Sequence, residues 1–71
     1  MNEKQLLFNF KEVEMKDVEF SKWLRDREWT GEYNSIGNFN QFIINDEIIA
    51  LVKYRNEYPV NRWIYIRKEE N

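Results

Sequence analysis

Apolar positions are densest in the last third of the chain, where short polar breaks separate three runs. The runs cover residues 39–45, 48–55 and 60–68. Each is rich in β-branched and aromatic side chains, which is typical of strands. Residues 45–47 include Asn and Asp, which tolerate positive φ, and predict a tight first hairpin with a two-residue loop at 45–46 or 46–47. Residues 56–59 end in proline and predict a longer second link. The pattern therefore predicts a three-stranded antiparallel meander.

The faces of this meander follow from its register, because directly opposed residues share a face. If both hairpins have the same parity, one face is aliphatic and consists of Phe42, Ile44, Ile49, Leu51, Ile64 and Ile66. The other face is more aromatic and consists of Phe39, Ile43, Ile48, Ala50, Val52, Tyr54, Trp63 and Tyr65. A three-residue loop would change both sets. Neither face is typical of a surface built for water.

Residues 5–15 are predicted to form a further strand at the start of the chain. Leu6, Phe8 and Phe10 alternate with other positions, and the alternation changes phase near Lys11. That change indicates a bulge or break in the strand. We expect the strand to pair with an edge of the meander and cover its open backbone groups.

A single amphipathic helix is predicted over residues 18–28. Asp17 is a favoured N-cap residue, and Phe20, Trp23 and Leu24 form an apolar stripe at helical spacing. Residues 29–38 contain two glycines and several Asn and Ser residues, so they are predicted to be an irregular loop.

The predicted fold class is α+β, as a single domain over residues 1–71. One helix packs its apolar stripe onto the aliphatic face of a three- to four-stranded antiparallel sheet. The predicted element order is strand, helix, strand, strand, strand. A chain of 71 residues buries a smaller share of its surface than a larger domain does, so stability depends on dense packing of its large side chains.

The amino-acid composition argues against several classes of function. The chain has neither Cys nor His, so it lacks the commonest zinc ligands, the usual general base and the thiol nucleophile. We therefore predict no enzyme activity, no catalytic residue, no metal and no cofactor. The net charge of −2 argues against a partner that is recognised through long-range attraction to a polyanion.

The lengths of the apolar runs bear on where in the cell the protein resides. None approaches the roughly 18–20 residues of a membrane span, and the start lacks the basic and apolar regions of a signal peptide. We predict a cytoplasmic protein that does not bind a membrane.

Two short motifs have both a chemical and a structural interpretation. Glu12 and Glu14 would place two carboxylates on one strand face, where one pKa can rise for acid–base work. Gly31 and Gly37 lie in a polar loop of the kind that can cradle phosphate, but the lysine of a phosphate-binding loop is missing. In both cases the structural interpretation, a charged strand edge and an ordinary loop, is favoured.

Residues 4–8 resemble the Gln-Leu-x-Leu-Phe peptide by which bacterial proteins bind the replication sliding clamp. Gln5, Leu6, Leu7 and Phe8 match this pattern with one residue missing before the phenylalanine. Short apolar strands produce such strings readily, so an ordinary strand is the favoured interpretation.

The aromatic face is the candidate binding site. Its residues, with two more from the loop, are Phe39, Tyr54, Trp63, Tyr65, Arg67, Trp29 and Tyr33. One helix covers only one face of such a sheet, so the other face is predicted to dock a partner protein or a second copy in a homodimer. Aromatic rings beside arginines also suit nucleobase stacking, which makes nucleic-acid or nucleotide binding the alternative. A plain second hydrophobic layer is the structural interpretation.

In length and in its high content of Asn, Lys and Glu, the whole chain resembles short accessory proteins of phages and mobile elements of low-GC bacteria. The resemblance implies a stoichiometric inhibitor or modulator that binds a host protein, for example a defence component. The predicted function is therefore a non-catalytic protein-binding module.

Overall fold

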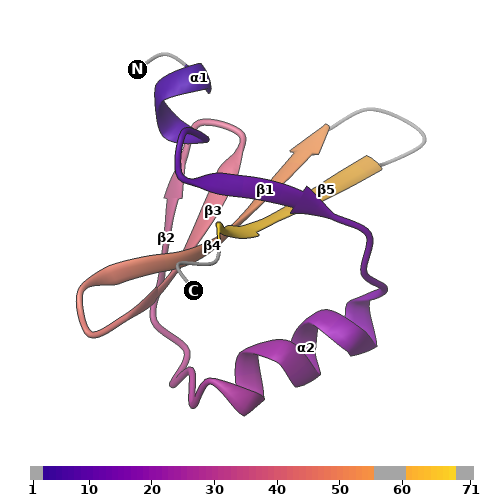
Figure 1. Cartoon of the computed structure of the whole chain (residues 1–71), viewed down its shortest axis with the longest axis vertical. Helices are drawn as coiled ribbons and strands as arrows, with labels where there is room; N and C mark the ends of the chain where they lie inside the picture. The colour runs from indigo at the N-terminus through magenta and orange to yellow at the C-terminus, as the bar shows by residue number, and fades with distance from the viewer. Residues whose placement is uncertain (1–2, 56–60, 69–71) are drawn as a thin grey trace.

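The computed structural model describes residues 3–55 and 61–68 (Figure 1). The helices of this part of the chain are α1 (Glu3–Leu6) and α2 (Asp17–Asp26). Its strands are β1 (Phe10–Val13), β2 (Tyr33–Ile36), β3 (Phe39–Ile44), β4 (Glu47–Arg55) and β5 (Asn61–Arg67). The strands form one five-stranded antiparallel sheet in the order β1-β5-β4-β3-β2. The α+β class and the meander are confirmed, and the sheet is wider than predicted. The predicted second link, residues 56–59, lies outside the described residues.

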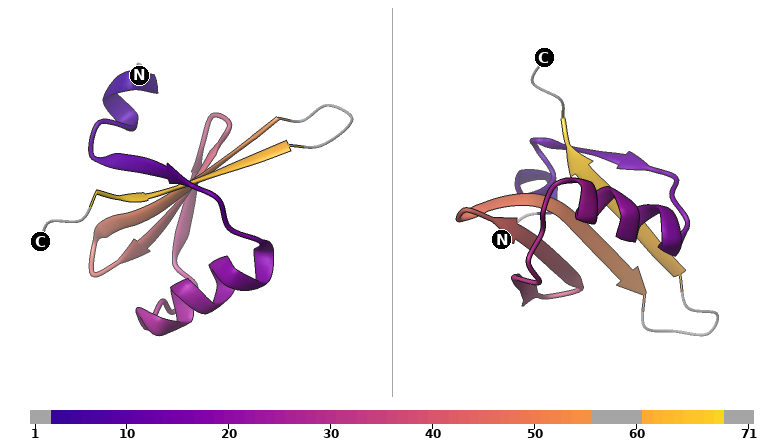
Figure 2. Two further views of the ribbon diagram at one scale, coloured as in Figure 1. Left: turned by 45° about the vertical axis from the view of Figure 1, so that its right-hand side comes forward. Right: turned by 90° about the horizontal axis from the view of Figure 1, so that it is seen from below.

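The two helices lie on opposite sides of the sheet (Figures 1 and 2). The longer helix, α2, runs along one face, and the single turn of α1 lies beyond the other. The connection from β1 to α2 carries the chain across one edge of the sheet. The prediction of one helix on one face is therefore right for α2 but omits α1.

The first strand, predicted over residues 5–15, is confirmed only as β1, and the predicted bulge near Lys11 is wrong because pairing with β5 runs through Lys11 without a shift. Pairing of β1 with β5 begins at Phe10, opposite Arg67, and covers an edge of the meander as expected. Residues 5–8 instead form the end of α1 and a turn, in which Phe8 N–H donates to the Gln5 carbonyl at 3.3 Å. The strand prediction there is wrong because β5 ends at Arg67, so the alternating apolar residues have no strand opposite them in the described chain. Glu, Lys, Gln and Leu are all good helix formers.

The predicted helix is confirmed, although its cap is one residue earlier than predicted. Lys16 is the N-cap residue, and its backbone N–H donates to Glu19 Oε1 at 2.7 Å. This bond is the Glu19 half of a capping box, and it gives the N–H of the N-cap residue a hydrogen-bond partner. Asp17 is then the first residue of the helix.

The other end of α2 has the bonds of a Schellman motif. Trp29 N–H donates to the Leu24 carbonyl at 3.1 Å, and Glu28 N–H donates to the Arg25 carbonyl at 2.9 Å. Glu28 occupies the left-handed position of the motif with φ of 61°, where glycine is the usual residue. The motif directs the chain back so that Trp29 packs against the core.

The predicted loop over residues 29–38 contains the strand β2. Ile36 pairs with Phe39 across a two-residue turn whose first residue, Gly37, has φ of 58°. A glycine at that position is what a type II′ hairpin turn requires. The loop prediction is wrong because the weak strand propensity of Asn34 and Ser35 outweighed this turn signal.

The hairpin between β3 and β4 is as predicted. Ile44 pairs with Glu47, which leaves Asn45 and Asp46 as a two-residue loop with φ values of 52° and 66°. Two successive positive φ angles define a type I′ turn.

A β-bulge in β4 changes the predicted faces. Phe42 pairs with Ala50 and Ile43 pairs with Ile48, so Ile49 is an extra residue of β4. An extra residue reverses the alternation of the strand beyond it. The predicted positions of Ala50, Val52 and Tyr54 on one face and of Leu51 on the other are therefore wrong. The register of β4 with β5 pairs even-numbered with even-numbered residues, so the predicted faces of β3 and β5 hold.

We call the face that α2 covers the helix face. Its central residues are Phe42, Ala50, Val52, Ile64 and Ile66. We call the opposite face the outer face. Its residues are Asn34, Ile36, Phe39, Gln41, Leu51, Lys53, Trp63 and Tyr65.

The hydrophobic core lies between α2 and the helix face. Phe20 and Leu24 of α2 are buried against Ala50, Val52 and Ile64. The prediction that α2 packs on the sheet is confirmed, but Ala50 and Val52 were predicted on the opposite face. Trp23 lies at the rim, half-buried, with its ring stacked at 5.9 Å from that of Phe20. The Arg27 guanidinium lies 3.9 Å from the centre of the Trp23 ring.

Candidate binding surface

A row of four side chains crosses the open part of the outer face. Trp63, Lys53, Phe39 and Ile36 lie directly opposite one another on β5, β4, β3 and β2. We call these four residues the outer row. Because side chains of opposed residues stand 4.5–5.5 Å apart in an antiparallel sheet, the row is continuous across four strands.

Lys53 links the aromatic members of the outer row. Its Nζ lies 5.8 Å from the centre of the Trp63 ring and 5.9 Å from that of Phe39. A lysine stem packs as an apolar group while its ammonium interacts with ring faces. The row therefore has a cation between two aromatic rings.

Exposure differs along the outer row. Phe39 is only 7% exposed, whereas Ile36 at the edge of the sheet is 38% exposed and Trp63 is half-buried. Phe39 thus forms a floor, and the accessible apolar surface lies at the two ends of the row.

A neighbouring row on the same face, here called the closed row, is buried at its two central members. Its members, again directly opposite one another, are Tyr65, Leu51, Gln41 and Asn34. Leu51 is fully buried, and Gln41 Oε1 accepts a hydrogen bond at 3.5 Å from Asn34 Nδ2. The Tyr65 ring lies 6.4 Å from that of Phe39, so the closed row supports the outer row from one side.

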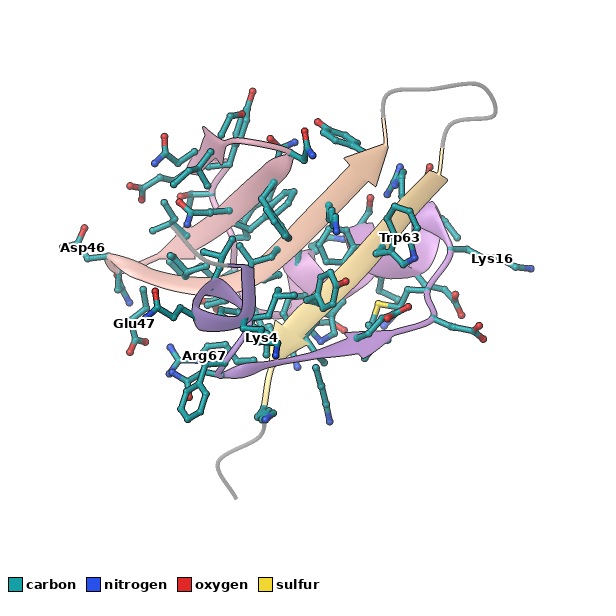
Figure 3. All side chains as sticks on the ribbon, turned by 90° about the horizontal axis from the view of Figure 1, so that it is seen from above. Lys4, Lys16, Asp46, Glu47, Trp63 and Arg67 are labelled. Atoms are coloured by element: carbon teal, nitrogen blue, oxygen red, sulfur yellow. The ribbon has the colours of Figure 1, made fainter. Side chains whose placement is uncertain are left out.

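The arrangement of α1 explains which part of the outer face is open. In Figure 3, Lys4 of α1 lies near Arg67 and Glu47, while Trp63 lies towards the other end of β5. Arg67 Nη1 and Glu47 Oε2 form an ion pair at 3.5 Å at the α1 end. The Trp63 end is the part of the face farther from α1.

The structure brings together only part of the predicted site. Phe39, Trp63 and Tyr65 share the outer face as predicted, and Arg67 lies at its α1 end. The three remaining residues lie on the helix side, so the predicted grouping is wrong.

Each of those three residues has a local contact on the helix side. Tyr54 accepts a hydrogen bond from Asn40 Nδ2 at 2.8 Å. The rings of Trp29 and Tyr33 lie 5.2 Å and 6.3 Å from that of Phe42. The bulge at Ile49 moved Tyr54, and the Schellman motif and β2 placed the other two.

Sequence reasoning missed two members of the outer row. Lys53 was not predicted as a site residue because its position opposite Trp63 depends on the parity of the β4–β5 link. Ile36 was assigned to a loop. The Gly37-Asn38 pair between Ile36 and Phe39 was the signal that identifies this hairpin.

A second, acidic region lies where β1 leads into α2. An open groove of about 640 Å³ is lined there by Glu12, Glu14, Asp17 and Glu19, among others. Arg62 Nη2 forms an ion pair with Asp17 Oδ1 at 2.8 Å within it. Strand β1 ends at Val13, so Glu14 does not share a strand face with Glu12. Within residues 3–55 and 61–68, no three acidic groups are clustered in a way that could hold a metal ion.

The segment that resembles a clamp-binding peptide is not extended, because residues 4–6 belong to α1 and residues 7–8 form a turn. Leu6 and Leu7 are half-buried, and Phe8 is 72% exposed beside the apolar surface of Lys4 and Gln5. Lys68 Nζ lies 6.0 Å from the Phe8 ring.

Comparison with known proteins found no matching family model, no matching curated protein and no matching solved structure. In the described part of the chain, neither helix has the length and apolar character needed to cross a membrane.

Proposed function

We propose that this protein is a non-catalytic protein-binding module whose partner docks on the outer row. The setting that we propose is the one implied by the resemblance in length and composition. In that setting, an accessory protein of a phage or mobile element acts in the cytoplasm and inhibits or modulates a host protein.

The observation that carries this proposal is the continuous outer row on the face opposite α2. Trp63 and Ile36 offer accessible apolar surface at its ends, and Phe39 lies buried between them. Tryptophan is among the residues that contribute most to binding energy at protein interfaces. The Lys53 ammonium adds a charged group beside this apolar surface, and most interfaces combine an apolar centre with polar groups around it.

The test is capture of a host polypeptide from lysate at about 0.3 M salt, where purely electrostatic nucleic-acid contacts weaken steeply. The variant is Trp63→Ala, and the matched control is Tyr54→Ala, an aromatic truncation on the adjoining strand but on the helix face. We expect the control to retain the polypeptide and Trp63→Ala to lose it. Retention by both variants would contradict the proposal.

Lys53 favours a second candidate function, nucleobase or nucleotide binding. Proteins that bind single strands combine cationic side chains with aromatic rings on which bases stack, at about 1–3 kcal/mol per base. Lys53 between Phe39 and Trp63 has this combination. The net charge of −2 supports the protein partner instead, because nucleic-acid surfaces are usually basic.

Tryptophan fluorescence separates the two candidates. A nucleic-acid platform requires quenching by oligonucleotides or cyclic nucleotides that is lost in Trp63→Phe and weakens with salt. We expect no such quenching at salt concentrations that preserve polypeptide capture.

A further inference from the structure

The strand β2 forms one edge of the sheet and is open to a partner along its length. All four of its residues are exposed, and Tyr33 has 58% of its surface accessible. Its sequence, Tyr-Asn-Ser-Ile, carries no charge. The edge is therefore neutral, accessible and regular in its pairing with β3.

The backbone groups that face outward from β2 follow from its pairing. The Glu32 carbonyl accepts from Ile43 N–H at 3.0 Å, in line with the register of β2 and β3. Hydrogen-bonded and non-hydrogen-bonded pairs alternate along an antiparallel ladder, so Asn34 and Ile36 direct their backbone groups to β3. The N–H and C=O groups of Tyr33 and Ser35 consequently point away from the sheet.

The other edge of the sheet, unlike β2, is protected against pairing with another chain. Its strand, β1, presents Lys11 and Glu12, and charged side chains on an edge oppose pairing with another chain. The β2 strand combines outward backbone groups with neutral side chains and has no such charge.

We propose that β2 pairs antiparallel with β2 of a second copy, around a two-fold axis that passes beside Asn34. In this register Tyr33 of each copy opposes Ser35 of the other, and the two Asn34 side chains meet on the outer face. The outward N–H and C=O groups of Tyr33 and Ser35 in both copies are then all paired, through four interchain hydrogen bonds. Any other antiparallel register leaves some of these groups without a partner from the strand.

The two-fold axis of such a pair is perpendicular to the sheet, so the two copies turn the same face to the same side. Both α2 helices lie on one side of a continuous ten-stranded sheet, and both outer rows lie on the other. The dimer presents two copies of the proposed binding surface in one plane, which suits a two-fold or repeated target. The pairing itself does not depend on the proposed function of the outer row.

Four residues per strand form a small contact, so we expect a reversible dimer. Interfaces of this size are typical of weak and transient association. Sedimentation equilibrium of the full chain should show a monomer–dimer equilibrium with a dissociation constant between about 10 μM and 1 mM. A wild-type chain that remains monomeric at about 1 mM would overturn the proposal.

Charge variants at Asn34 test the register. Asn34→Lys and Asn34→Asp each place like charges opposite each other across the two-fold axis, which should weaken association about tenfold or more. A mixture of the two variants places opposite charges there and should restore association as a heterodimer. Dimerisation of either single variant at wild-type strength would overturn the proposed register, and so would a mixture that remains monomeric.

A proline pair tests the backbone contacts. Ser35→Pro removes an outward N–H and should abolish the dimer while circular dichroism stays unchanged. The control is Glu12→Pro on the opposite edge. The Asn9 carbonyl accepts from Lys68 N–H at 2.8 Å, so Glu12 also directs its backbone groups outward. The control should leave dimerisation intact, and equal loss in both variants would contradict pairing at β2.

Discussion

The two faces of the sheet share the same strands but differ in what buries them. On the helix face, Phe20 and Leu24 reach down from α2 and bury Ala50, Val52 and Ile64. On the outer face, Leu51 and Phe39 are buried without any contact to α2 in the core cluster of the described chain, while Trp63 and Ile36 keep accessible surface. The comparison teaches that a large aromatic residue in a small domain does not have to be core. The buried core is concentrated where α2 covers the sheet, and the outer row keeps accessible apolar surface at its ends.

Truncation beneath α2 should have the largest effect on stability. Leu24 is 5% exposed and belongs to the core, so Leu24→Ala should lower the free energy of unfolding by about 2–5 kcal/mol. Urea denaturation measures this change. A loss below about 1 kcal/mol would show that α2 does not hold the helix face as described.

Truncation on the outer row should have a smaller effect on folding. Trp63 is half-buried and packs beside Lys53, so Trp63→Ala should cost about 1–2 kcal/mol. The same denaturation series as for Leu24→Ala gives the comparison directly. If Trp63→Ala is the more destabilising variant, the outer row belongs to the core and the contrast between the faces fails.

The C-terminal cap of α2 offers a stabilising change on the helix side. Glu28 has φ of 61°, and replacing such a residue by glycine relieves roughly 1 kcal/mol of backbone strain. Glu28→Gly should therefore raise the unfolding free energy by up to about 1 kcal/mol. Arg27→Gly is the control, because Arg27 has φ of −99° and glycine there should destabilise the domain. Equal effects of the two changes would argue against the cap geometry.

The smallest effect should come from the surface ion pair that joins α2 to β5. Asp17 and Arg62 are bonded at 2.8 Å, but the Asp17 side chain is well exposed to water. Asp17→Asn should change the unfolding free energy by less than about 1 kcal/mol, and added salt should reduce the difference. A larger, salt-independent loss would mean that this contact is a main attachment of α2.

Local signals predicted a large part of the fold. The Asn45-Asp46 turn, the three long strands and the apolar stripe of α2 were all readable, because turn chemistry and periodicity act over a few residues. The β2 strand was missed because Asn34 and Ser35 favour turns in isolation, and pairing with β3 overrides that preference.

The candidate site was less predictable than the fold. Placing Lys53 opposite Trp63 requires the parity of the β4–β5 link, and placing Tyr54 on the face opposite Phe39 requires knowing that Ile49 is an extra residue in β4. Nothing in the composition of residues 48–50 marks a bulge, because three apolar residues in a row fit either face of a strand. The extra residue and the parity of the β4–β5 link together put Tyr54 on the face opposite Phe39, Trp63 and Tyr65.

Thiol labelling tests most directly whether partners bind the outer row. The chain contains no cysteine, so Lys53→Cys and Ser21→Cys each introduce a single thiol, one in the outer row and one on the exposed side of α2. The measurement is the rate of alkylation of each variant alone and with its captured polypeptide. We predict that the polypeptide protects the thiol at position 53 and leaves that at position 21 unchanged. Protection at position 21 alone, or at neither position while the polypeptide is bound, would contradict the account.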